Sequence, residues 1–154
     1  MSESASPLRE PGEDYEAPHA PRARRLGRIL IVDDFPDAIE MYRMYFDHSG
    51  YEVLSAGDGL SAVAMALRSV PDVIVMDLSL PGLDGWEATR RLKRDARTRH
   101  IPVVVLTGHA LAGHSQGAMD AGCDAFITKP CLPERLLEEI RTILDATPRP
   151  RSES

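Results

Sequence analysis

The groups in this chain that could do chemistry each follow a short apolar run. In chain order they are Asp33, Asp34, Asp77, Thr107, Lys129 and Pro130. If the runs are strands of one parallel sheet, their carboxyl ends share an edge, where a ligand is expected to bind. Each residue also has a purely structural interpretation, because an Asp after a strand often caps the next helix. A Thr or a Lys can be an ordinary strand or surface residue. The coincidence at four strand ends favours a common site.

The chemistry of such a site follows from its residue types. Crowded carboxylates are costly unless a cation lies among them, and an all-oxygen ligand set with room for water favours Mg²⁺. Asp77, ionised at neutral pH, can attack phosphorus without a general base. Mg²⁺, the Lys129 ammonium and the Thr107 hydroxyl would stabilise the transferred phosphoryl group. Only two of the 18 basic residues are lysines, Lys93 and Lys129, and lysine suits a compact point charge.

Strands and helices that would position these groups alternate along the chain. Apolar, β-branched runs occur at 28–32, 51–56, 72–76, 101–106 and 124–128. Stretches with helical spacing lie between or after them, at 36–49, 60–69, 84–94, 111–121 and 133–146. The alternation predicts an α/β fold with a five-stranded parallel sheet and helices on both faces. Neither glycine-rich phosphate-loop motif is present, so no nucleotide site is expected.

Composition sets the remaining limits. The chain has 154 residues, 43% of them hydrophobic and 27% charged, as in one globular domain. No apolar run is long enough for a membrane span, and the N-terminus lacks a signal peptide, so we expect a cytoplasmic protein. The net charge of −6 argues against general nucleic-acid binding. The two cysteines are expected to be reduced thiols.

Two terminal segments are predicted to be disordered tails on either side of a domain at residues 28–146. Residues 1–27 contain four prolines among serine, glutamate and arginine, and residues 147–154 are similar. A small arginine cluster just before residue 26 leaves an interaction motif as the alternative for the first tail.

The domain resembles the receiver domain of two-component response regulators. The resemblance rests on the acidic pair 33–34, the sequences MDL at 76–78 and LPGLDG at 80–85, then LTG at 106–108 and TKP at 128–130. It covers residues 28–146. It implies a (βα)5 flavodoxin-like fold with strand order 2-1-3-4-5.

The resemblance also implies a role for each site residue. Asp77 is similar to the phosphoacceptor. Asp34 is similar to the direct Mg²⁺ ligand, with Asp33 acting mostly through water, and Asp77 and the backbone carbonyl of Ser79 complete the metal shell. Ser79 and His109 occupy positions that tune the lifetime of the aspartyl phosphate.

Three further positions resemble the family's switch. Thr107 is similar to the hydroxyl residue that moves toward the phosphoryl group. Lys129 resembles the lysine that pairs with that group, and its bond to Pro130 is expected to be cis. Phe126 stands where the family has an aromatic switch residue, which as phenylalanine can rotate but cannot donate a hydrogen bond.

The expected function is that of a stand-alone, single-domain response regulator in a bacterial phosphorelay, not a metabolic enzyme. A histidine kinase or histidine phosphotransfer protein would phosphorylate Asp77. The fourth helix, fifth strand and fifth helix would then signal to a protein target, or the phosphoryl group would be passed on. The chain would be a monomer or a phosphorylation-linked dimer that binds neither membranes nor nucleic acid.

Gly113 and Gly117 are expected to make the fourth helix only marginally stable. The helix would then be either an element that moves on phosphorylation or a poor helix held by packing.

Two other functions compete with this one. A small aspartyl phosphatase of the haloacid-dehalogenase class would carry an Asp-x-Asp motif, but the residues at 33–36 are DDFP. A receiver-like adaptor that works without phosphorylation is the other alternative, and the complete acidic set argues against it.

Overall fold

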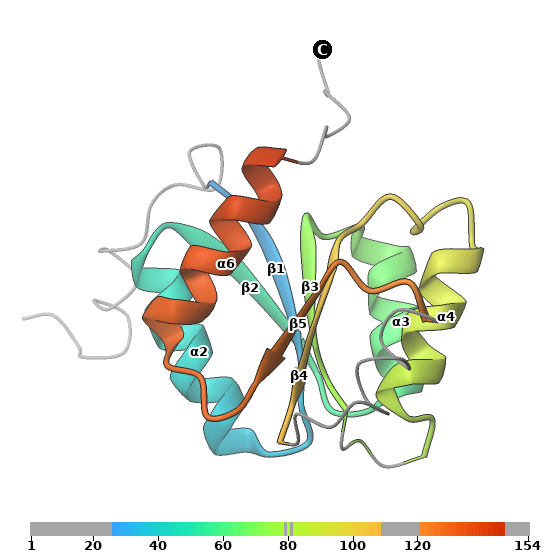
Figure 1. Cartoon of the computed structure of the whole chain (residues 1–154), viewed down its shortest axis with the longest axis horizontal. Coiled ribbons are helices and arrows are strands. Elements are labelled where there is room, and N and C mark those ends of the chain that lie inside the picture. Colours follow the sequence, from blue (N-terminus) through green and yellow to red (C-terminus); the bar gives the residue numbers. More distant parts are fainter. Residues whose placement is uncertain (1–25, 79, 81, 109–120, 147–154) are drawn as a thin grey trace, which may run out of the picture.

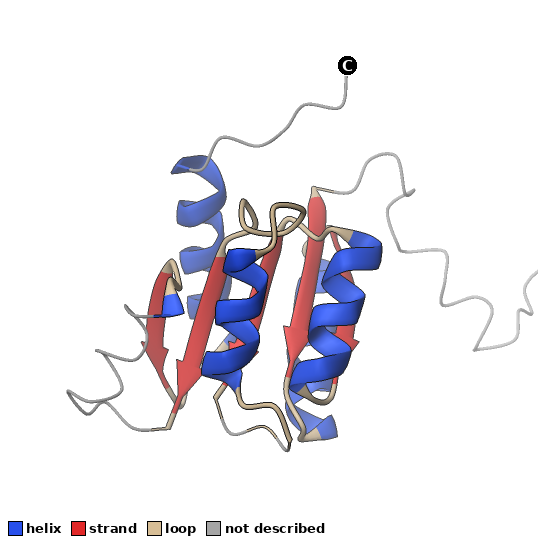
Figure 2. Cartoon of the chain, turned by 90° about the vertical axis from the view of Figure 1, so that its right-hand side faces the viewer, coloured by secondary structure: helices blue, strands red, loops and turns tan. Residues whose placement is uncertain are grey.

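Five parallel strands form one sheet in the order β2-β1-β3-β4-β5, in agreement with the predicted fold and strand order. The computed structural model describes residues 26–78, 80, 82–108 and 121–146. The strands are β1 (Gly27–Val32), β2 (Tyr51–Ala56), β3 (Val73–Asp77), β4 (Val103–Thr107) and β5 (Ala125–Thr128). Figure 2 shows them side by side and running in the same direction. Asp77 and Thr107 are the last residues of β3 and β4, so each of these strands ends one residue later than the predicted apolar run.

Helices cover both faces of the sheet. They are α2 (Pro36–His48), α3 (Gly59–Ser69), α4 (Gly85–Arg94) and α6 (Pro133–Ala146). α2 and α6 lie on one face, α3 and α4 on the other (Figure 1). The predicted helix at 111–121 falls almost wholly outside the described residues, as do the predicted tails. No helix among the described residues is long and apolar enough to cross a membrane.

Side-chain alternation along the strands divides the core into two layers. In β1, Ile29 and Ile31 pack toward α2 and α6, whereas Leu30 and Val32 pack toward α3 and α4. β3 and β4 follow the same pattern, and all three strands are buried at their centres. Their continuous apolar runs are explained by this burial on both faces.

Helix starts lie next to the carboxyl edge of the sheet and differ in how they are capped. The Asp58 side chain accepts a hydrogen bond from the Ser61 amide at the start of α3. Asp84, predicted as the first residue of α4, is its N-cap and accepts from the Glu87 amide. The N-cap of α2 is Phe35, with no side-chain cap bond. Asp33 and Asp34 are therefore not the cap of α2, and their carboxylates are available to the site.

Candidate functional site

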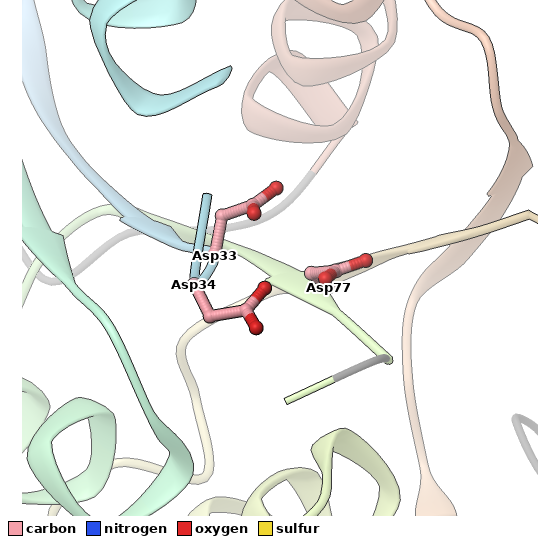
Figure 3. A group of neighbouring side chains, drawn as sticks. All are labelled: Asp33, Asp34 and Asp77. Atoms are coloured by element: carbon pink, nitrogen blue, oxygen red, sulfur yellow. The ribbon is translucent and has the colours of Figure 1, made fainter. Parts of the chain in front are cut away.

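The ends of β1 and β3 bring three carboxylates together. Because these strands are neighbours in the sheet, Asp33 and Asp34 after β1 lie beside Asp77 at the end of β3 (Figure 3). Each offers a carboxylate oxygen, and these atoms all lie within 4.8 Å of one another. Asp33 and Asp77 are buried, whereas Asp34 is exposed. The cluster is therefore withdrawn from water on one side and open on the other.

Asp33 shows the electrostatic cost of this crowding. Its pKa is raised above the usual value, chiefly because burial disfavours the charged form, and the charges of Asp77 and Asp34 act in the same direction. The Phe35 amide, which donates a hydrogen bond of 2.9 Å to Asp33 Oδ1, and the Lys129 ammonium oppose the shift. A bound cation would relieve the repulsion.

Lys129 reaches the same carboxylates from the end of β5. Its Nζ lies 3.0 Å from Asp77 Oδ1 and 3.6 Å from Asp33 Oδ2. Burial by itself would lower the pKa of the Lys129 ammonium, but the hydrogen bond and charge of Asp77, together with Asp33, outweigh it and raise the pKa. The ammonium is therefore charged at neutral pH. The peptide bond from Lys129 to Pro130 is cis.

Thr107 and Phe126 lie toward the α3 and α4 face. Thr107 is buried at the end of β4, and its carbonyl accepts a hydrogen bond of 2.6 Å from the Lys129 amide. Phe126 packs against the core layer of α3 and α4, where it stacks on Trp86. It also lines a hollow of about 440 Å³ beside β5 and α6, together with residues that include Arg135 and Glu139.

The structure thus gathers Asp33, Asp34, Asp77 and Lys129, with Thr107 at the adjoining strand end. Ser79 and His109 lie outside the described residues. The sequence analysis did not predict two contacts that the structure shows near the site. The Trp86–Phe126 stack had one available signal, an aromatic residue directly after the LPGLDG sequence. The hydrogen bond from the Tyr42 hydroxyl to the Cys131 carbonyl had only a weak sequence signal, which was a tyrosine, with its polar hydroxyl, on the apolar face of a helix.

The donor set fits a hard divalent cation. Three carboxylates without imidazole or thiolate ligands suit Mg²⁺ or a similar ion, and the exposed Asp34 leaves room for coordinating water. The adjacent ammonium could pair with a second anionic group. Together these groups can hold a metal ion and a phosphoryl group side by side.

Comparisons with known proteins place most of the chain in one family. The profile of the response regulator receiver domain matches residues 29–141. The DNA-binding dual master transcriptional regulator RpaA of Synechocystis is 38% identical over 122 residues, and the match covers 79% of this chain but 51% of RpaA. The polar-differentiation response regulator DivK of Brucella ovis is 37% identical over 116 residues, which cover 75% of this chain and 94% of DivK. The chain thus spans about half the length of the first relative and nearly all of the second.

Solved structures agree with the sequence comparisons. A CheY-like receiver domain protein of Methanospirillum hungatei JF-1 superposes with a TM-score of 0.75 at 30% identity, covering 79% of this chain and 96% of that one. The receiver domain of the sensor histidine kinase PA1611 of Pseudomonas aeruginosa PAO1 has a TM-score of 0.70 at 32% identity, with 78% and 98% covered. The latter structure holds a magnesium ion coordinated in its active site cleft.

Proposed function

The chain belongs to the response regulator receiver family, and from that premise we propose that Asp77 accepts a phosphoryl group from a phosphohistidine. Receiver domains are signalling domains that interact with histidine kinases and phosphotransfer proteins. The observation that carries the proposal is the placement of Lys129 Nζ, 3.0 Å from an oxygen of Asp77 within a cluster of three carboxylates.

The reaction is a transfer between two nucleophiles. An Asp77 carboxylate oxygen attacks phosphorus, the bond from phosphorus to the imidazole nitrogen breaks, and its electron pair returns to that nitrogen. Lys129 turns its ammonium from the free carboxylate to the phosphoryl oxygens, and the Thr107 hydroxyl donates to them. Asp33, Asp34 and Asp77, with the Ser79 carbonyl, would hold Mg²⁺. When bound, this ion neutralises charge on the carboxylates and the phosphoryl oxygens.

Exposed apolar side chains around the site support a protein donor. Phe35, Leu60 and Leu132 are 58%, 60% and 68% exposed. Phe35 and Leu132 lie in the connections after β1 and β5, and Leu60 is the second residue of α3, the helix that follows β2. All three therefore lie near the carboxyl edge of the sheet. Apolar groups clustered around a charged centre are suited to a docked protein surface. The donor is therefore a phosphorylated histidine presented on a protein.

We propose that the surface that signals to the protein target, the output surface, consists of β5, α6 and residues 111–121. The hollow lined by Phe126 lies on the part of this surface that β5 and α6 form. Phe126 stands three residues before Lys129 in the chain. A change at Lys129 on phosphorylation would reach this surface along β5. The phosphoryl group is read there by a protein target, or is passed on to a second phosphotransfer protein.

The direct test is the intact mass of the chain after incubation with acetyl phosphate and Mg²⁺. A gain of one phosphoryl group that requires Mg²⁺ and is absent in Asp77→Asn is the expected result. No gain with any donor, in a chain whose fold is intact by circular dichroism, would contradict the proposal and favour a phosphorylation-independent adaptor. Leu132→Ala should slow transfer from a phosphohistidine protein while leaving the reaction with acetyl phosphate unchanged.

A further inference from the structure

A buried hydroxyl joins helix α2 to the segment that carries Lys129. Tyr42 is 4% exposed, and its ring stacks on that of Phe46 at a centroid distance of 5.9 Å, so the core holds the side chain in place. The Tyr42 hydroxyl donates a hydrogen bond of 2.7 Å to the main-chain carbonyl of Cys131. Cys131 lies two residues after Lys129.

The segment between β5 and α6 is short of main-chain donors. β5 ends at Thr128, and the Lys129 amide bonds to the end of β4. Pro130 and Pro133 have no N–H group to donate, and the Leu132 side chain between them is largely exposed. Burial of the Cys131 and Pro133 side chains holds this stretch in place, and the hydrogen bond from the Tyr42 hydroxyl adds a directional contact to a main chain that has few donors of its own.

We propose that Tyr42 is a positioning residue for the chemistry at Asp77, and that its bond to the Cys131 carbonyl sets where the Lys129 ammonium lies. This inference rests on the proposed function, which gives Lys129 its role. α2 begins two residues after Asp34, so Tyr42 links the helix that follows the acidic pair to the segment that follows Lys129. The Lys129 side chain is long and one-third exposed, and its reach depends on where its main chain is held.

Burial keeps the Tyr42 hydroxyl a donor. Burial raises the pKa of Tyr42 to about 12, and the negative charges of Asp33 and Asp77 act in the same direction. The hydroxyl is therefore protonated throughout the neutral range.

The test compares two tyrosines of one helix. Tyr42→Phe removes the hydroxyl and keeps the ring. Tyr45→Phe is the matched control, since Tyr45 meets Phe46 edge-on at 6.2 Å on the same helix. The full chain, free of metal, is treated briefly with an amine-acylating reagent, and the modification of each lysine is read by peptide mass spectrometry. Lys93 serves as the internal reference, because its ammonium bonds to the Ile101 carbonyl and to Asp124, away from this segment.

In Tyr42→Phe we expect the ratio of Lys129 to Lys93 modification to rise about fivefold, the factor that corresponds to one neutral hydrogen bond. Phosphorylation of Asp77 by acetyl phosphate should slow by a similar factor, while Mg²⁺ affinity stays within about twofold because the acidic cluster is untouched. Tyr45→Phe should change neither quantity.

Two other outcomes are decisive in different ways. If Tyr42→Phe only lowers the unfolding midpoint and leaves the modification ratio and the phosphorylation rate as in the parent chain, Tyr42 is a core residue and the inference is wrong. If the parent chain takes up no phosphoryl group, the proposed function fails. The modification ratio then still decides whether Tyr42 places the Lys129 ammonium.

Discussion

The indole of Trp86 lies almost parallel to the ring of Phe126, with 6.4 Å between ring centroids and 9° between ring planes. Trp86 is the second residue of α4, whose first residue, Gly85, packs on the main chain of Asp77. Phe126 lies on β5, three residues before Lys129, which contacts the Asp77 side chain. The stack therefore joins two elements that both touch the proposed phosphoacceptor.

Replacing Phe126 by leucine should change the fluorescence of the chain's single tryptophan. The substitution removes the ring that covers one face of the indole, so water reaches it. We expect emission at longer wavelength and stronger quenching by acrylamide. Phe35→Leu, which replaces an exposed ring in another loop, is the control and should leave emission unchanged. Identical spectra for the parent chain and Phe126→Leu would show that the stack is not populated in solution.

Mg²⁺ should stabilise the fold, since it relieves repulsion that the folded chain creates. At a concentration one hundred times its dissociation constant, Mg²⁺ should add about 2.7 kcal/mol to the free energy of unfolding. Thermal unfolding with and without EDTA measures this gain. Asp34→Asn should abolish most of the response, whereas Asp145→Asn on α6, away from the cluster, should keep it. Equal midpoints with and without Mg²⁺ in the parent chain would contradict the metal site.

Asp33 should also destabilise the metal-free chain at neutral pH. Its folded-state pKa is raised above the usual 3.8, so the folded state binds this proton more tightly than the unfolded state does. Ionised Asp33 therefore lowers the free energy of unfolding. This loss is complete above the folded-state pKa and disappears as the pH falls below about 3.8. Asp33→Asn should therefore be more stable than the parent chain in EDTA at pH 7, and this difference should shrink at acidic pH. Urea unfolding at several pH values measures it, and a variant less stable at pH 7 would refute the sign.

The residue pattern was sufficient to predict a parallel sheet and the meeting of the acidic groups at its edge, for reasons that lie in individual residues. Ile29 to Val32 are apolar without a break because each faces a helix layer, and the following acids must then stand at the sheet edge. The family resemblance added the strand order and the roles of Asp77 and Lys129. These features depend on short patterns that repeat along the chain.

Contacts between distant segments could not be predicted in the same way. The Tyr42 hydroxyl and the Cys131 carbonyl are 89 residues apart, and their bond depends on how α2 and α6 pack. The Trp86–Phe126 stack depends on the rotation of two rings from different elements. The backbone of Val70 could not be predicted either, because a Val before a Pro gives no sign of a left-handed conformation.

Alkaline pH should destabilise the fold partly through Tyr42. Its folded-state pKa of about 12 exceeds the ordinary 10.0, so its contribution to stability is complete below pH 10 and is lost as the pH rises from 10 to 12. Tyr42→Phe lacks this ionisation. Between pH 9 and pH 11 it should lose less unfolding free energy than the parent chain, by on the order of 1 kcal/mol. Denaturant unfolding at both values measures the difference, and equal losses would place the Tyr42 pKa near 10.

Val70→Asn should stabilise the chain. Val70 follows α3 with φ of 45° and ψ of 68°, a left-handed conformation that costs a β-branched residue roughly 1–2 kcal/mol. Asparagine tolerates this conformation, and Val70 is 44% exposed, so only part of its side-chain packing is lost. We expect the free energy of unfolding to rise by about 1 kcal/mol in chemical denaturation. Val70→Ala should show a smaller gain, and a loss in both variants would indicate that the valine side chain packs usefully.

Gly85→Ala should damage the fold and the site together. A Cβ at Gly85 would lie 2.6 Å from the Asp77 carbonyl oxygen and 3.1 Å from the Leu78 Cα. Both are main-chain atoms that cannot rotate away, so either α4 or the end of β3 must shift. We expect a loss of about 1–3 kcal/mol in the free energy of unfolding.

The end of β3 carries Asp77, and this links the stability of Gly85→Ala to its chemistry. A displaced strand end should weaken Mg²⁺ binding and slow phosphorylation in the fraction of molecules that remain folded. Gly108→Ala is the control, because a Cβ there would meet no atom within 4 Å among the described residues beyond its chain neighbours, although Gly108 directly follows Thr107. Its stability should match that of the parent chain. If Gly85→Ala unfolds earlier but phosphorylates at the parent rate once folded, α4 yields instead of β3, and the position of Asp77 is set by the sheet alone.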